Sequence, residues 1–193
     1  VILVSLFWNL TIVSNSIIEA ATIDADVNYK KDILFRRWNA LHGGVYVPVN
    51  DTTVPNPYLS HLPHRDLIIN DSLTLTLINP AYMTRMIYEL ALGQGIFSSR
   101  VISDNPLNPL NKADSIELTG LAKLGKGESL FKIQYTKNDT DFLKFVFPFF
   151  TEPPCLQCHA QKGYKIGDLR GGISITLPLN KYQEAHTQER TGL

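Results

Sequence analysis

The feature that most constrains this chain is the run C-L-Q-C-H, which places Cys155, Cys158 and His159 within one pentapeptide. The two cysteines are the only ones among 193 residues, so all of the thiol chemistry lies in one short segment. Residues three apart in a helical turn lie on the same face, so both sulfurs can point toward one planar group. The adjoining imidazole then lies under the centre of that group.

This spacing is typical of covalent c-type haem attachment. The two thiols add to two vinyl groups of one porphyrin, and the histidine coordinates the iron as the proximal axial ligand. We therefore predict one covalent haem c, held by Cys155, Cys158 and His159, with His159 as a metal ligand.

Three other interpretations of the motif stay open. A thioredoxin-type redox couple normally opens a helix after a strand, whereas Pro153 and Pro154 precede this motif. A structural zinc ion needs four ligands, and the sequence offers only scattered further histidines and no second cysteine pair. A short-loop disulfide suits an oxidising compartment but gives no role to His159.

The charge balance argues against a nucleic-acid partner. Lysine plus arginine equals aspartate plus glutamate at 18 each, so the formal net charge is zero. The sequence contains no run of five basic residues and no array of aromatic residues interleaved with basic ones. It also shows no convincing set of acid and base groups for chemistry at an open iron site, so we expect a binding protein and not an enzyme.

The first part of the chain predicts a long helix. Residues 1–18 are apolar but are interrupted by polar residues. A helix that spans a membrane needs about 20 largely apolar residues, so this segment is interpreted either as part of a membrane anchor or as a helix that packs in a core or an oligomer. Helical spacing of apolar residues continues to Leu41, and Gly43 and Gly44 end the pattern.

The rest of the chain predicts strands and short helices in succession. Asn79 and Pro80 have the identities that begin a helix, as N-cap and first helical residue. A further short helix is predicted at residues 115–126. The predicted strands are at 45–49, 73–78, 129–135, 142–150 and 172–179, and Lys137 to Asp139 supply a hairpin turn.

This order predicts the α+β class, with a PAS-like antiparallel sheet flanked by helices and a long N-terminal helix. We divide the chain into a membrane-proximal or anchoring helix at 1–43, a haem domain at 44–179 and an exit helix at 180–193.

The sixth coordination position of the iron has three candidates. Met83 is the first, because it lies one turn inside the helix that begins at Pro80, and Met86 is its rival on the same face. His42 is the other alternative, since the glycines behind it allow a close approach to a porphyrin. Each has a plainer interpretation: methionines at helical spacing usually fill cores, and a histidine at a helix end often caps it.

Cations are expected to pair with the two haem propionates. Arg85, Lys165 and Arg170 are the predicted partners, because they lie on the Met83 helix or follow the C-L-Q-C-H motif. Phe147, Phe149 and Phe150, just before the motif, are predicted to form part of the haem wall.

Three blocks of the sequence resemble the haem-c PAS-like sensor family of bacterial histidine kinases and chemoreceptors. They are R-R-W-N-A-L-H-G-G-V-Y-V-P-V at 36–49, L-I-N-P-A-Y-M-T-R at 77–85, and C-L-Q-C-H-A-Q-K-G-Y-K-I-G-D-L-R-G-G-I-S-I at 155–175. The resemblance implies an extracytoplasmic haem-binding sensor. Some members of that family use a distal cysteine, which this chain lacks.

These observations lead to two functional hypotheses. The first is a sensory domain that detects redox state or a small gas and signals through its terminal helices; the second is a monohaem electron-transfer protein. Haem attachment by this motif takes place outside the bacterial cytoplasm, so we expect a periplasmic or other extracytoplasmic protein, anchored to the membrane through its N-terminal helix. A homodimer formed through that helix is a further expectation.

Overall fold

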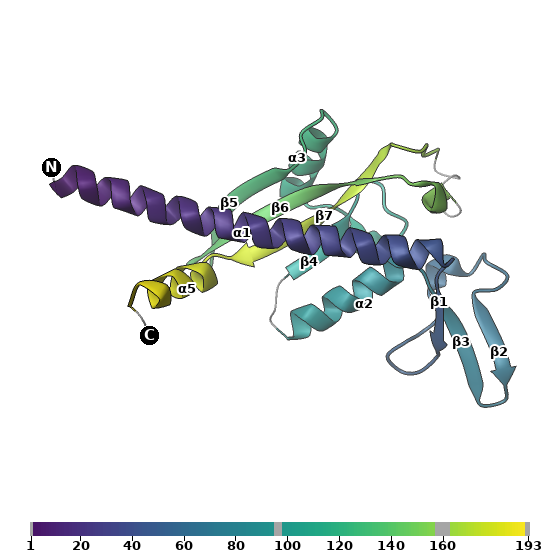
Figure 1. Cartoon of the computed structure of the whole chain (residues 1–193). Coiled ribbons are helices and arrows are strands. Elements are labelled where there is room, and N and C mark those ends of the chain that lie inside the picture. Colours follow the sequence, from purple (N-terminus) through teal and green to yellow (C-terminus); the bar gives the residue numbers. More distant parts are fainter. Residues whose placement is uncertain (1, 95–97, 157–162, 192–193) are drawn as a thin grey trace.

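One helix of 40 residues, α1 (Ile2–Leu41), runs the length of the molecule (Figure 1). The structure, a computed structural model, describes residues 2–94, 98–156 and 163–191. The helix ends as predicted, because Gly43 and Gly44 take positive φ angles of 72° and 101° that favour glycine. Among the described residues, no helix combines the length and apolarity needed to cross a membrane.

Two antiparallel sheets follow α1, which confirms the predicted α+β class. A small sheet has the order β1-β3-β2 and a larger one has the order β4-β7-β6-β5. The described strands are β1 (Val45–Pro48), β2 (Asp66–Asn70), β3 (Leu73–Ile78), β4 (Ser98–Ile102), β5 (Phe131–Lys137), β6 (Thr140–Phe150) and β7 (Leu169–Pro178).

Two of these strands, β2 and β4, have no counterpart in the sequence-based prediction. Both lie at a sheet edge. Ile68 in β2 is 81% exposed, so this strand lacks the apolar alternation that marks a half-buried strand. β4 forms by pairing with β7, far away in the sequence, and local patterns do not report such pairing.

The predicted hairpin between β5 and β6 is present. Asn138 and Asp139 have φ angles of 50° and 56°, the left-handed values that a tight two-residue turn requires. The turn sets a register in which Phe131 pairs with Val146 and Lys137 pairs with Thr140.

The helix α2 begins with the predicted cap, and α3 begins with a cap that the sequence analysis did not predict. Asn79 accepts a hydrogen bond from the backbone N of Tyr82 at 2.9 Å, and Pro80 is the first residue of α2. Asp114 and Glu117 form a reciprocal capping box on α3. The described helices after α1 are α2 (Pro80–Gly93), α3 (Ser115–Leu124), α5 (Asn180–Thr191) and the short 3-10 turns η1 (Pro57–Leu59), η2 (Pro109–Asn111) and η3 (Pro153–Cys155).

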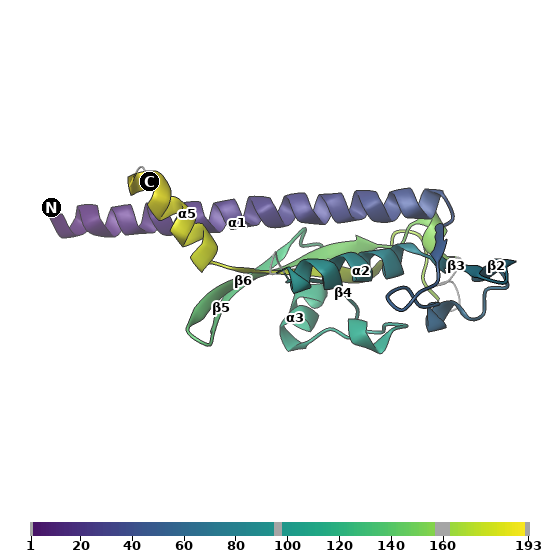
Figure 2. The same cartoon turned by 90° about the horizontal axis from the view of Figure 1, so that it is seen from below.

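Helices cover both faces of the larger sheet (Figure 2). α1 packs on the face that presents Phe145 and Ile173, and the small residues Ala21 and Ala25 let it approach closely. α3 covers the opposite face, where Val146 is fully buried. Successive side chains of β6 therefore point in turn toward α1 and toward α3, which is the period-two pattern of a strand buried on both faces.

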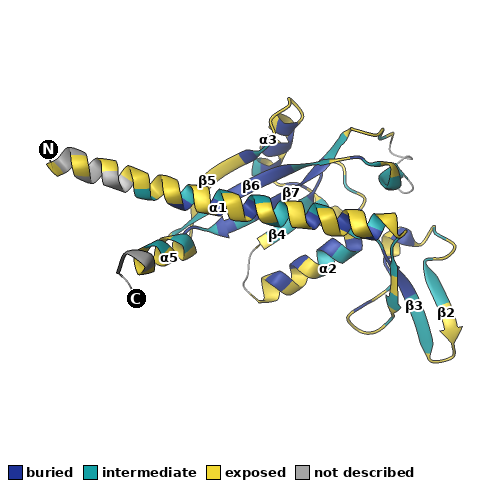
Figure 3. Cartoon of the chain, viewed as in Figure 1, coloured by how far each residue is buried: buried dark blue, intermediate teal, exposed yellow. Residues whose placement is uncertain are grey.

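Buried residues recur along the side of α1 that meets the body of the protein (Figure 3), and their type changes from apolar to polar along the helix. Its earlier part buries apolar residues such as Ile17. Its last turns bury Asp32, Arg36 and Asn39 instead. Polar side chains in this position need partners, so the end of α1 near β1 marks a place where the core becomes polar. The predicted domain boundaries at residues 43 and 179 stay predictions.

Candidate functional site

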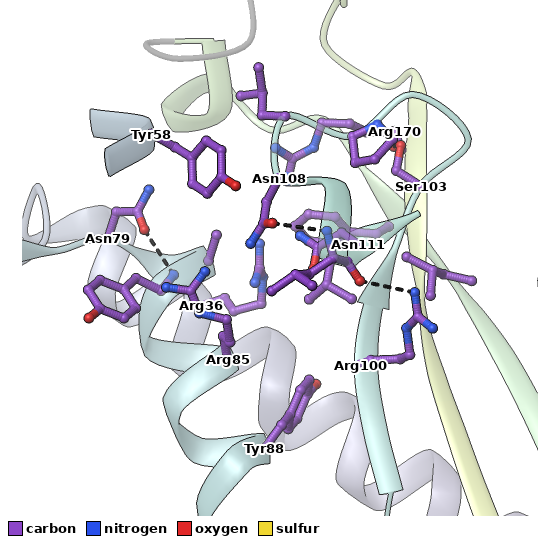
Figure 4. Close-up of a pocket in the computed structure, with 18 of the residues that line it drawn as sticks. Arg36, Tyr58, Asn79, Arg85, Tyr88, Arg100, Ser103, Asn108, Asn111 and Arg170 are labelled. Carbon is purple, nitrogen blue, oxygen red and sulfur yellow. Dashed lines mark hydrogen bonds between the residues drawn. The ribbon is translucent and has the colours of Figure 1, made fainter. Parts of the chain in front are cut away.

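A cavity of about 390 Å³ lies between α2, the edge strand β4 and the loops that carry η1 and η2. α1, β6 and β7 each contribute a side chain to it: Arg36, Phe149 and Arg170. Figure 4 shows how residues from these separate segments surround the one space.

The walls of the cavity are largely aromatic and aliphatic. The aromatic residues that line it are Tyr58, Tyr82, Tyr88, Phe149 and Tyr164, and the aliphatic ones are Leu59, Ala81, Leu92, Val101, Ile102, Pro106, Leu107 and Leu110. Such a lining with a few polar groups is typical of a site for a flat organic ligand.

Positive charge dominates among the charged residues of the lining. Four arginines contribute to it, and Glu89 is the single carboxylate among the described residues that do. Glu89 lies 3.9 Å from Arg85 on the exposed side of α2. The cavity therefore favours a ligand that carries negative charge. The arginines are Arg36, Arg85, Arg100 and Arg170.

Arg36 is the most deeply placed of these cations. Its side chain is 6% exposed, and its Nη1 donates to the hydroxyl of Thr84 at 3.0 Å and to the carbonyl oxygen of Pro80 at 3.3 Å. Its Nε is buried and makes no hydrogen bond to any described residue. Burial, and then the neighbouring charge of Arg170, lowers the pKa of Arg36 to about 10.

A buried hydrogen-bonded pair lies behind Arg36. The hydroxyl of Tyr88 donates to Oδ2 of Asp32 at 2.5 Å. Burial raises the pKa of the Asp32 carboxyl, and the bond from Tyr88 and the charge of Arg36 oppose that rise. Tyr88 also lines the cavity, so it connects the cavity wall to a carboxyl group in the core.

Cys155, the first residue of the C-L-Q-C-H motif, lies beside the end of α1. Cys155 is the last residue of η3, the short turn that follows Glu152. Glu152, three residues earlier, forms a 2.5 Å salt bridge with Arg37 of α1. Cys158 and His159 lie outside the described residues, so their predicted roles stay predictions.

The candidates for a sixth iron ligand lie around the junction of α1 and α2. Met83 is half-buried, and its sulfur accepts a 3.7 Å hydrogen bond from the side chain of Asn39. His42 is exposed, with its ring 4.5 Å from that of Trp38. Met83, Met86 and His42 are not among the cavity-lining residues in the described part of the chain. Their ligation also stays a prediction.

The predicted propionate partners separate into two groups. Arg85 and Arg170 both line the cavity, and Phe149 of the predicted wall contacts it as well. Lys165 is exposed in the loop before β7, where its backbone N donates to Asp168 at 2.7 Å. Phe147 faces α1 and stacks on Tyr29, with ring centroids 4.5 Å apart.

Sequence reasoning missed Arg36 and Arg100. Arg36 carried a signal, because Asp32, Arg36 and Asn39 follow helical spacing on the same face as the buried alanines of α1. Charged residues on a core-facing stripe indicate either a polar network or a ligand. Arg100 carried none, since β4 itself was not predicted.

Comparison with known proteins gives one family. A model of the Tll0287-like family, described as Tll0287, matches residues 19–178. Among solved structures, the crystal structure of the cyanobacterial heme-protein Tll0287 aligns with a TM-score of 0.48 and 15% sequence identity, over 83% of this chain and 94% of that one. No curated protein matches. Because the family model covers most of the sequence, the chain belongs to the Tll0287-like family.

Proposed function

We propose that this chain binds one c-type haem in the cavity between α2 and β4. Cys155 and Cys158 attach it, and His159 is the proximal ligand. The observation that carries this proposal is the position of Cys155 at the end of η3, because Glu152 just before η3 forms a 2.5 Å salt bridge with Arg37, the neighbour of the cavity-lining Arg36.

The residues of the cavity fit such a group. A porphyrin is a flat apolar ring with two carboxylates, and the cavity combines aromatic walls with four arginines. The buried Nε of Arg36 lacks an acceptor among the described residues, as expected for a donor that serves a ligand. A bound haem supplies reversible one-electron chemistry, and an open axial position also binds small gases.

Family membership supports the proposal independently of this geometry. The family takes its name from Tll0287, which is itself a cyanobacterial heme-protein. The C-L-Q-C-H motif lies inside the matched residues 19–178, and so do all four cavity arginines.

We further propose that the haem serves sensing and not catalysis. Arg36 and Arg37 belong to the last turns of α1, and they connect this long helix to the cavity and to η3. A change in redox state or ligation next to these residues can alter the packing of α1, which extends far beyond the site (Figure 1). Electron transfer is the alternative, favoured if the iron is six-coordinate and does not respond to gases.

The proposed location is the periplasm or another extracytoplasmic space, since this motif receives its haem there, and α1 is the proposed connection to a membrane. A redox protein or a small gas is the proposed partner. The sequence motif and the length of α1 support these proposals.

The experiment is expression of the chain with a c-type haem ligation system, followed by intact mass measurement. The wild type should carry the added mass of one haem, and Cys155→Ala with Cys158→Ala should carry none. Optical spectra of oxidised and reduced protein, with and without CO, then separate the two functions. A bare polypeptide mass for the wild type would exclude covalent haem.

A further inference from the structure

Two arginines from distant parts of the chain contact one aromatic ring in the cavity. The guanidinium carbon of Arg36 lies 4.3 Å from the ring centroid of Phe149, and that of Arg170 lies 4.4 Å from the same centroid. α1, β6 and β7 supply one residue each, so the arrangement exists only in the folded protein. We call these three residues the arginine clamp.

The arginine clamp places like charges close together in a buried region. Each of the two guanidinium groups interacts favourably with the face of Phe149, but a ring quadrupole offsets only a small part of the cost of burying a full charge. No carboxylate among the described residues lies within 4.0 Å of Arg36 in a salt bridge. The carboxyl of Asp32 acts on Arg36 through charge but forms no salt bridge with it, and burial raises the pKa of that carboxyl. A buried cation with only this partial compensation favours a further negative group at the site.

The hydrogen-bonding geometry indicates where that group binds. Nη1 of Arg36 is directed to α2 through Thr84 and Pro80. Its Nε has no hydrogen-bond acceptor in the described part of the chain, although only 6% of the residue is exposed to solvent. A carboxylate matches the planar fork of a guanidinium better than a single-point acceptor does.

We propose that Arg36 and Arg170 together bind a carboxylate group beside Phe149. The carboxylate has two chemical sources, a propionate of the haem or a free small dicarboxylate, and the first of these rests on the proposed function. In both cases Arg36 acts as a positioning residue that links the ligand to α1. This role goes to Arg36, which was not among the predicted propionate partners, and not to the more exposed Lys165.

The test uses the full chain as holoprotein and four variants. Arg36→Gln and Arg170→Gln remove one charge each from the arginine clamp, and Arg36→Lys keeps the charge but removes the fork. Lys31→Gln is the matched control, because it removes the same charge from an exposed position on α1. Intact mass first reports haem attachment, and circular dichroism reports folding.

Three measurements then distinguish the sources. Resonance Raman spectra report the bending frequency of the haem propionates, and a redox titration reports the midpoint potential. Calorimetry with succinate reports binding of a free carboxylate.

If the haem supplies the carboxylate, the propionate frequency shifts and the midpoint potential falls in both Gln variants. The fall follows because a lost cation favours ferric iron. Arg36→Lys restores part of the potential, and Lys31→Gln changes neither quantity. If a free carboxylate is the ligand, the wild type binds succinate and both Gln variants lose at least tenfold in affinity.

Unchanged Raman frequencies and potential, together with no succinate binding that depends on Arg36 or Arg170, would overturn the proposal. Absence of haem from the wild type would instead contradict the proposed function. The succinate measurement alone would then decide whether the arginine clamp binds a carboxylate.

Discussion

Asn79 fixes the start of α2, the helix that forms one wall of the cavity. Its side chain accepts the backbone N–H of Tyr82, one of the donors that have no partner within the helix. Asn79→Ala should reduce the free energy of unfolding by about 1 kcal/mol, whereas Asn79→Asp should keep the cap. Urea denaturation of both variants measures this. Equal losses for Ala and Asp would show that the cap contributes nothing.

The environment of Asp114, at the start of α3, predicts that the stability of the protein depends on pH. It accepts the backbone N–H of Glu117 at 2.8 Å and the ammonium of Lys144 at 3.0 Å. Burial raises the pKa of Asp114, but these hydrogen bonds outweigh burial, so the pKa lies below its ordinary value. A lowered carboxyl pKa adds stability that is complete above about pH 4, the ordinary value for Asp, and is lost as pH falls through the folded value.

The corresponding variant is Asp114→Asn, which keeps an acceptor for the Glu117 amide and removes only the charge. We expect this variant to be less stable than the wild type at pH 7, with a difference that shrinks toward pH 2. Because Asp114 is 46% exposed, the effect should stay below about 1 kcal/mol. Urea midpoints at several pH values measure it, and a difference independent of pH would contradict the assignment.

At the scale of elements, β7 joins the sheet through two glycines. Gly171 has a φ of 155°, and a Cβ there would lie 2.2 Å from the carbonyl oxygen of Ile102 in β4. A Cβ on Gly172 would lie 2.7 Å from the carbonyl oxygen of Phe147 in β6. The strand can approach both neighbours only without side chains at this point. Arg170, which lines the cavity, directly precedes these two glycines in β7.

Gly171→Ala should therefore destabilise the protein by about 2 kcal/mol or more, because backbone atoms must move to admit the methyl group. Gly93→Ala is the matched control, since no atom lies within 4 Å of a Cβ at that helix end. We expect the control to be neutral or slightly stabilising. Thermal unfolding of both variants checks the comparison, and similar midpoints would show that the close approach at β7 is relaxed without cost.

For the molecule as a whole, the sequence predicted the helices and strands better than the contacts between them. The long helix, the capped α2, the β5–β6 hairpin and the α+β class all carry local signals such as Asn79 or the turn at Asn138. The cavity has no local signal, because it collects side chains from α1, α2, β4, β6, β7 and three loops. Arg36 and Arg170 meet at Phe149 only through long-range packing. The sequence therefore predicted the haem chemistry of the C-L-Q-C-H motif but did not predict the cavity.

The two halves of α1 differ in their contacts, and this predicts how much of the helix the domain needs. The side chains of Ile2, Trp8 and Ile12 are exposed, whereas packing against the core begins at the partly buried Val13 and full burial runs from Ile17 through Ala25. Deletion of residues 1–12 should change the free energy of unfolding by less than about 1 kcal/mol, because the apolar side chains described there, Ile2, Trp8 and Ile12, are exposed.

Deletion of residues 1–25 removes the buried Ile17, Ala21 and Ala25 and uncovers Phe145 and its neighbours on the sheet. Since each buried aliphatic side chain contributes roughly 1–3 kcal/mol, this longer deletion should cost more than about 3 kcal/mol and expose apolar surface to the dye ANS. Urea denaturation of both truncations tests the distinction. A large loss from the shorter deletion would mean that the first three turns of α1 are also held in place, by a second copy of the chain or another partner that covers their exposed apolar residues.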